Sequence, residues 1–238
     1  MTMKIPFVAA LLFAFAAPSF AADAIKPFRA EYATLRNGDE VGRTTLELAD
    51  NGDGSWTLCS ETRGTSGLAR LAGIHIVETS RFRWKDGRPE ALAYDYKQEG
   101  TFKQRTRHAA FDWQAGSVSV SEGGKDYHYA TVPGLIDRQS VTLALASDLV
   151  HGAGTFEYPV AVKDRVETMR YVRGAVESRK VPAGEYRAQL MQRDGEPGED
   201  RKRVARSWFA ESLGWLPVEI EQTEKKGDTV TLRLVAVR

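Results

Sequence analysis

The sequence has a single cysteine, Cys59, among its 238 residues. One thiol cannot form an intramolecular disulfide, so the folded chain must be stabilised by a packed core. Cys59 ends residues 55–59, a run typical of a strand, and no histidine flanks it. We therefore interpret it as a small buried strand residue and not as a catalytic thiol.

The chain also has almost no net charge, because 33 Lys and Arg residues oppose 32 Asp and Glu residues, and its isoelectric point is near 7.8. Such a balance gives no overall field that holds a polyanion, so general nucleic-acid binding is excluded. The four histidines are scattered without the spacing of metal ligands, and no motif names a substrate or a reaction. We predict neither a metal site nor a cofactor.

Long apolar runs are missing except at the start of the chain. There, Lys4 precedes the apolar residues 7–17, and the small residues Ser19 and Ala21 follow. This pattern is typical of a secretory signal peptide, and the apolar run is shorter than the ~20 residues that a membrane-spanning helix needs. We expect cleavage after Ala21, a mature chain of residues 22–238 without a transmembrane segment, and a periplasmic or secreted location.

Beyond Ala22, apolar and polar residues alternate with a period of two. In one such run Leu216, Val218 and Ile220 alternate with Glu219 and Glu221, which predicts an antiparallel strand whose two glutamates face solvent. Residue pairs that close hairpins separate several of these runs: Asn37-Gly38, Asp86-Gly87 and Gly123-Gly124. We predict an all-β, mainly antiparallel fold, a curved sheet, roll or half-barrel, in one domain because no linker or repeat divides the chain.

Residues 137–150 are the exception, because Val141, Leu145 and Leu149 recur at every fourth position. This spacing predicts one amphipathic helix that plugs or flanks the sheet. Asp137 is a suitable cap for its first turn, and Gly152 is a suitable stop.

Short motifs extend this picture over nearly the whole mature chain: Phe28-Arg29-Ala30-Glu31-Tyr32, Val41-Gly42-Arg43, Gly87-Arg88-Pro89-Glu90-Ala91-Leu92, Asp137-Arg138-Gln139-Ser140, Val181-Pro182-Ala183-Gly184, and Trp208 with Leu216-Pro217-Val218-Glu219-Ile220. In these motifs the chain resembles DUF3108, a family of uncharacterised exported bacterial proteins. The resemblance implies an exported, β-rich protein and assigns no activity.

Two basic clusters are candidates for binding an anionic head group. Lys103, Arg105 and Arg107 recur at a period of two, which aligns them on one face of a strand, and Arg206 follows the basic residues 201–203. The alternative is that these cations form a solvated face or protect a strand edge. The sequence leaves both interpretations open.

The aromatic residues near predicted strands either fill the core or line an apolar concavity. Trp208 and Arg206 share strand parity, so both side chains should lie on one side of the sheet and join an apolar ring to a cation. We take as candidate ligand-binding residues Trp208, Arg206, Trp84, Trp113, Lys103, Arg105 and Arg107.

These features favour a non-enzymatic envelope protein that binds a lipid or another amphiphile, or an envelope protein partner. One alternative is a hydrolase assembled from distant residues, in which Asp137, Ser140 and a histidine are the first suspects, although helix capping explains Asp137 and Ser140 as well. No Gly-x-Ser-x-Gly motif is present. A structural scaffold is the third class.

Overall fold

The computed structural model describes residues 25–101, 104–195, 204–223 and 227–238. The predicted signal peptide, Lys103 of the first basic cluster and residues 201–203 of the second lie outside these ranges. Within them, no helix has both the length and the apolar composition that crossing a membrane requires.

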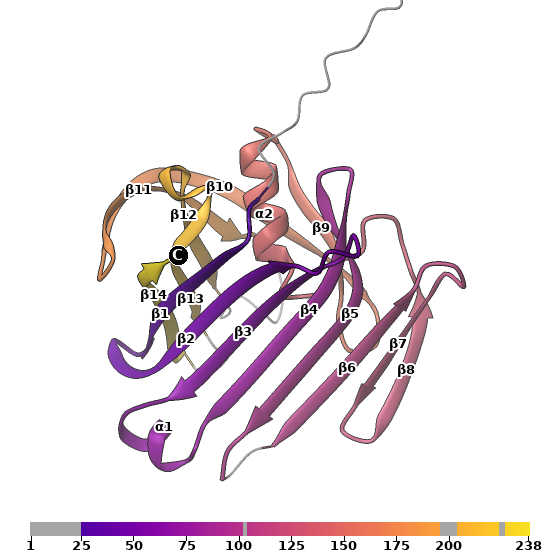
Figure 1. Ribbon diagram of the computed structural model, residues 1–238, viewed down its shortest axis with the longest axis horizontal. Helices are drawn as coiled ribbons and strands as arrows, with labels where there is room; N and C mark the ends of the chain where they lie inside the picture. Colours follow the sequence, from indigo (N-terminus) through magenta and orange to yellow (C-terminus); the bar gives the residue numbers. More distant parts are fainter. Residues whose placement is uncertain (1–24, 102–103, 196–203, 224–226) are drawn as a thin grey trace, which may run out of the picture.

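In the described part of the chain, fourteen strands form one antiparallel sheet (Figure 1). The first eight are β1 (Phe28–Arg36), β2 (Asp39–Asp50), β3 (Trp56–Gly64), β4 (His75–Lys85), β5 (Arg88–Glu99), β6 (Arg105–Asp112), β7 (Ser117–Glu122) and β8 (Lys125–Ala130). The others are β9 (Phe156–Ala161), β10 (Val166–Val181), β11 (Gly184–Arg193), β12 (Ala205–Ala210), β13 (Leu216–Thr223) and β14 (Thr229–Val237). The prediction of an antiparallel all-β fold is confirmed. Two helices, α1 (Gly67–Leu71) and α2 (Val141–Val150), and a 3-10 turn, η1 (Glu211–Leu213), complete the described elements.

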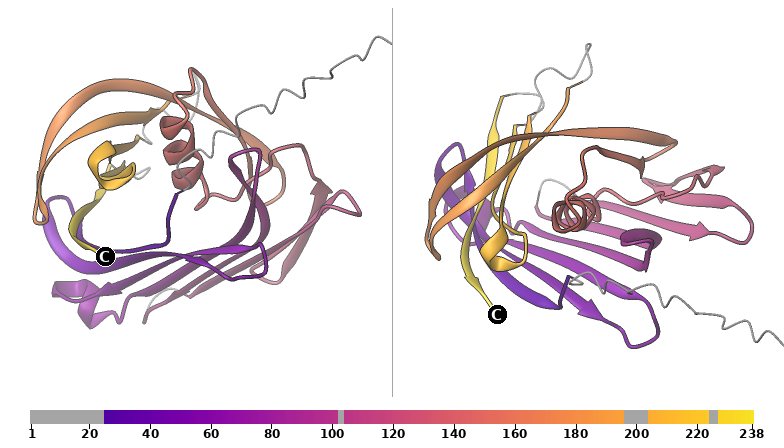
Figure 2. Two further views of the ribbon diagram at one scale, coloured as in Figure 1. Left: turned by 45° about the horizontal axis from the view of Figure 1, so that its top comes forward. Right: turned by 90° about the horizontal axis from the view of Figure 1, so that it is seen from above.

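The sheet consists of two meanders, β1–β8 and β9–β14, that join where β1 pairs with β14. Its edges are β8 and β9, so the sheet is not closed into a barrel. The chain between these edges spans the opening: Ile136 bridges to Val160 of β9, and the amide of Ala91 in β5 donates to the carbonyl of Leu135 at 3.2 Å. Figure 2 shows the sheet curving around α2.

The hairpins form where the sequence places their turn residues. Asn37 and Gly38 connect β1 to β2 with positive φ angles of 52° and 92°, the conformation that matches the twist of a two-residue hairpin. In β2 the alternating residues Thr44, Leu46 and Leu48 are buried. A period of two thus buries one face of the strand against the core.

The helix α2 begins at Val141, four residues after the predicted start. Asp137 accepts hydrogen bonds from the amides of Gln139 at 2.9 Å and Ser140 at 3.0 Å, and so caps the turn that precedes the helix. The helix is not amphipathic in its environment, because eight of its ten residues are buried. The reason is the curvature of the sheet, which covers even polar positions: Asp148 is buried and bound by Arg88 and Tyr158.

The buried residues form three clusters. The first joins both meanders, since Tyr32, Leu58 and Phe82 share it with Trp208 and Leu234. The second packs α2 against strands β9 to β12, and the third lies on β5 to β8 beneath Leu135. The core therefore holds the two meanders together and fixes α2 inside the curve.

Candidate functional site

Trp208 is a core residue on β12, only 3% exposed. Arg179 stacks on it, with 3.7 Å between the guanidinium carbon and the ring centroid. Its indole Nε1–H donates to Glu177 at 3.0 Å. The ring is therefore held by two residues of β10, the second strand from β12 in the sheet.

Arg206, two residues earlier on β12, binds Glu221 at 3.2 Å and Gln192 at 3.3 Å. These partners lie on the two adjacent strands, β13 and β11.

Glu219 was expected to face solvent together with Glu221, and this is wrong. Glu219 is buried and binds Arg233 at 3.3 Å, because it lies between the buried Trp208 on β12 and Arg233 on β14.

Trp84 and Trp113 occupy two different clusters. Trp84 packs edge-on against Phe82, with 5.2 Å between ring centroids, and its indole Nε1 is buried without a hydrogen-bond partner among the described residues. Trp113 packs on the third cluster and donates to the carbonyl of Ala91 at 2.7 Å. Trp84 therefore packs on the cluster that contains Trp208, whereas Trp113 does not.

Arg105 and Arg107 converge on one acid, as their shared strand parity predicts. Both guanidinium groups donate hydrogen bonds to the buried Glu122 of β7. Arg105 donates from Nε to Glu122 Oε1 at 2.6 Å and also from Nη2 to the same oxygen, and Arg107 donates from Nη2 to Glu122 Oε2 at 2.9 Å. Burial opposes ionisation of Glu122, but these bonds lower its pKa below the usual value. Seven strands separate β6 from β12, so the two basic clusters are not neighbours along the sheet.

A hollow of about 490 Å³ lies elsewhere, where β10, β11 and β12 meet η1. We call it the Trp215 hollow. Three of its lining residues are apolar: Val176, Phe209 and Trp215. Phe209 is fully buried and packs in the α2 cluster, whereas Val176 is 52% exposed. Exposed Arg187 adds a cation, and the remaining lining residues are Gln189, Glu211 and Ser212.

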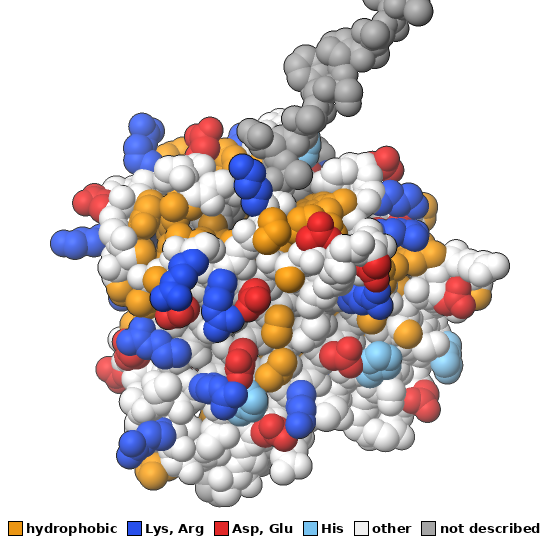
Figure 3. Space-filling model, viewed as in Figure 1, with side chains coloured by type: hydrophobic (Ala, Val, Ile, Leu, Met, Phe, Trp, Pro, Cys, Tyr) orange, Lys and Arg blue, Asp and Glu red, His pale blue; other side chains and the backbone are white. Residues whose placement is uncertain are grey.

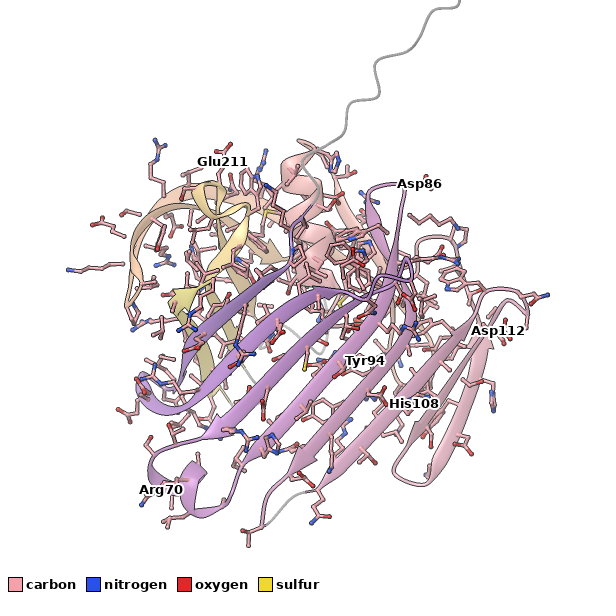
Figure 4. The ribbon with its side chains drawn as sticks, in the orientation of Figure 1. Arg70, Asp86, Tyr94, His108, Asp112 and Glu211 are labelled. Carbon is pink, nitrogen blue, oxygen red and sulfur yellow. The ribbon has the colours of Figure 1, made fainter. Side chains whose placement is uncertain are left out.

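Figure 4 labels Glu211 at the upper end of the molecule, above the curve of the sheet. In Figure 3 the orange hydrophobic side chains of this face gather in its upper part, and ions of both signs are scattered over the whole face. Glu211, one of the residues that line the Trp215 hollow, lies at this upper end.

The backbone of Trp215 is unusual. Its φ is 61°, a left-handed conformation that is rare for a bulky residue. The turn is fixed by hydrogen bonds from the amide of Gly214 to Glu211 at 3.0 Å and from the amide of Trp215 to Ala210 at 2.9 Å. Trp215 is one of the aromatic residues near predicted strands, but it is not among the candidate ligand-binding residues; Gly214 beside it was the available signal for a turn at this position.

A buried polar cluster attaches the start of α2 to β4. The hydroxyl of Ser80 lies 2.6 Å from Asp137 Oδ1 and 2.9 Å from Gln139 Oε1. Burial raises the pKa of Asp137, although its hydrogen bonds oppose the shift. Asp137 Oδ1 accepts the hydrogen bond of the Ser80 hydroxyl as well as those of the amides of Gln139 and Ser140, so this carboxyl group joins β4 to the turn before α2.

This cluster does not favour the hydrolase alternative. Asp137 and Ser140 are 1% and 0% exposed, and the Ser140 hydroxyl donates to Asp137 at 2.8 Å. The four histidines make their hydrogen bonds elsewhere: with Glu61, Asp95, Ser119 and Ser147. The contacts of Asp137 and Ser140 are those of a capped turn.

The chain is similar to two groups of uncharacterised proteins. Residues 27–235 match the sequence profile described as "Protein of unknown function (DUF3108)". A crystal structure of a β-barrel-like protein of the DUF1849 domain, from Brucella abortus, has a similar fold, with a TM-score of 0.54 and 13% sequence identity; the match covers 90% of this chain and 98% of that one. No curated protein matches the chain.

Proposed function

The chain belongs to the DUF3108 family, whose activity is unknown, and we propose that it binds an amphiphilic molecule without chemical turnover. The apolar part of the ligand lies in the Trp215 hollow, and an anionic end pairs with Arg187. The observation that supports this proposal is the combination of three apolar side chains and an exposed cation around one hollow of about 490 Å³. Small-molecule sites have volumes of about 300–1,000 Å³ and combine apolar walls with polar groups that orient the ligand. Here Gln189, Glu211 and Ser212 line the hollow beside Arg187.

The strained backbone supports a role for Trp215 itself. Holding a non-glycine residue at positive φ costs about 1–2 kcal/mol. Glycine adopts this conformation at little cost, yet the chain has a tryptophan at this position. The indole packs partly on the α2 cluster while lining the hollow. Each ligand methylene buried against such a surface contributes about 0.8 kcal/mol to binding.

We further propose that the protein acts in the cell envelope after export. The predicted signal peptide, with cleavage after Ala21, supports a periplasmic or secreted location. We also propose that residues 22–238 form a single domain; the first core cluster, which contains residues of both meanders, supports this.

Calorimetric titration with dodecanoate and with a neutral maltoside detergent, both below their micelle concentrations, tests the proposal. Val176→Glu places a carboxylate in the exposed wall of the hollow and should weaken both ligands at least about tenfold, since a desolvated charge is costly. Val172→Glu is the matched control, because Val172 lies on the same strand, is 48% exposed and does not line the hollow.

The cation is tested separately. Arg187→Gln should weaken dodecanoate and leave the neutral detergent unchanged, whereas Arg70→Gln, on exposed α1, should change neither. If neither amphiphile binds the wild-type protein, the amphiphile proposal is wrong, and an envelope protein partner or a scaffold role takes its place.

A further inference from the structure

A second hollow, of about 460 Å³, lies where the start of β6 and the β7–β8 hairpin face the turn between β9 and β10. We call it the basic hollow. Its charged lining residues are Arg105, Lys125, Lys163 and Glu122. Gly123 lines it through its backbone, and no atom lies within 4 Å of the place that a Cβ would occupy at this residue. The hairpin side of the hollow is thus open.

The acid in this hollow is already neutralised. Both carboxylate oxygens of Glu122 accept hydrogen bonds, one from Arg105 and the other from Arg107. Asp164, next to Lys163, binds Arg165 at 2.9 Å. Counting Arg107, four cations surround one carboxylate, which leaves three positive charges in excess.

The two lysines supply two of these three charges. Lys125 is exposed and forms no ion pair among the described residues, and the Nζ of Lys163 lies 5.1 Å from the centroid of the Tyr127 ring. Arg105 uses Nε and Nη2 on Glu122, so its Nη1 is available. Two ammonium groups beside a guanidinium suit an anion with several oxygens and more than one charge.

We propose that the basic hollow binds a phosphate group, either as inorganic phosphate or as the phosphomonoester of a larger molecule. Lys125 and Lys163 contact the phosphate oxygens, while Arg107 and Glu122 hold Arg105 in place. A monovalent carboxylate gains less from the same charges, so the hollow selects a dianion. This site is independent of the Trp215 hollow, which lies at β10 to β12.

The test is a titration of the full chain with inorganic phosphate and with water-soluble dihexanoyl phosphatidic acid, at fixed ionic strength, with acetate as the monovalent control. Binding should saturate and should shift the amide resonance of Gly123 in a nuclear magnetic resonance spectrum. The double variant Lys125→Gln/Lys163→Gln should bind at least about tenfold more weakly, because it lacks two charge-assisted hydrogen bonds. Lys180→Gln is the control, since Lys180 is exposed on β10 and does not line the hollow.

The outcomes of the two phosphate titrations distinguish the possible ligands. Binding of both phosphates shows that the group itself suffices, and binding of the phosphatidic acid alone assigns the site to a phosphorylated lipid. In either case Val176→Glu should leave phosphate binding unchanged, which separates this site from the amphiphile proposal. The proposal is overturned if neither phosphate binds, if acetate binds equally well, or if the double variant binds like Lys180→Gln.

Discussion

The guanidinium of Arg179 covers the ring of Trp208 at 3.7 Å, and Arg179 also approaches Glu219 at 3.9 Å. Glu177, which accepts the indole hydrogen bond, lies 3.4 Å from the same guanidinium. Trp208, which the sequence indicated as a candidate ligand-binding residue, is thus held by a cation and an acid of β10. Its partners indicate a stabilising role.

Replacing Trp208 should therefore affect stability. Trp208→Ala removes a buried ring and should lower the free energy of unfolding by about 3–5 kcal/mol, the usual cost of such a truncation. Urea denaturation measures this cost. Trp208→Phe, which keeps most of the ring volume, should cost less and should leave amphiphile affinity unchanged; weaker binding in Trp208→Phe would return this residue to the ligand site.

The sequence predicted the sheet well because a sheet with one buried face imposes a local pattern on each strand. The alternation in β2 and the hairpin at Asn37-Gly38 depend on neighbours along the chain, and the structure confirms both. The burial of Glu219 depends on Trp208 and Arg233, which lie opposite it on the two adjacent strands, and no local pattern reveals these neighbours. Cys59 likewise was expected to be buried and is only partly so, because its strand parity places it between Glu47 and Thr79.

Leu145 tests the packing of α2. It is 2% exposed in the cluster that joins the helix to strands β9 to β12. Leu145→Ala should lower the free energy of unfolding by about 2–5 kcal/mol, since it leaves a cavity inside the curve of the sheet. Leu68→Ala is the control, because Leu68 is 84% exposed on α1 and should change stability by about 0.5 kcal/mol or less. Equal melting curves for the two variants would contradict the position of α2.

The raised pKa of Asp137 predicts that the free energy of unfolding depends on pH. Burial raises its pKa in the folded chain, so the folded chain keeps this proton to a higher pH than the unfolded chain does. Its stabilising effect is complete below the unfolded pKa, near 3.9, and declines as the pH rises from there to the raised folded value. Asp137→Asn cannot ionise, so its stability should decline less over this pH range.

The measurement is the free energy of unfolding of both proteins at several pH values upward from about pH 4. Burial also raises the pKa of Glu78, and the charge of Asp137 raises it further, so the difference between the two profiles reports Asp137 together with its effect on Glu78. Asp126→Asn, at an exposed position, should follow the wild-type profile. Parallel profiles for wild type and Asp137→Asn would show that Asp137 is ionised in the folded chain.

The proposed export makes a prediction about the N-terminus. Because Ser19 and Ala21 are the small residues that signal peptidase reads, protein recovered from the producing cells should begin at Ala22. N-terminal sequencing of the exported fraction decides this. An intact Met1 or Thr2 terminus in the membrane fraction would reverse the proposed location.

The candidate site was less predictable than the fold, for a geometric reason. The Trp215 hollow combines Val176 and Arg187 with Phe209 and Trp215, which come from four separate segments. Their meeting depends on how far β10 and β11 curve over η1, and strand periodicity contains no information on curvature. The convergence of Arg105 and Arg107 was predictable, because it needs only the parity of one strand; their shared partner Glu122 was not.

Tryptophan emission during titration with dodecanoate is the most direct measurement of the amphiphile proposal. Trp215 is the tryptophan that lines the hollow, so the emission of the wild-type protein should change saturably. Trp215→Phe should lose most of this change while keeping the fold, and Trp84→Phe should keep it. A flat titration of the wild-type protein, or an equal response from Trp215→Phe, would contradict binding in the Trp215 hollow.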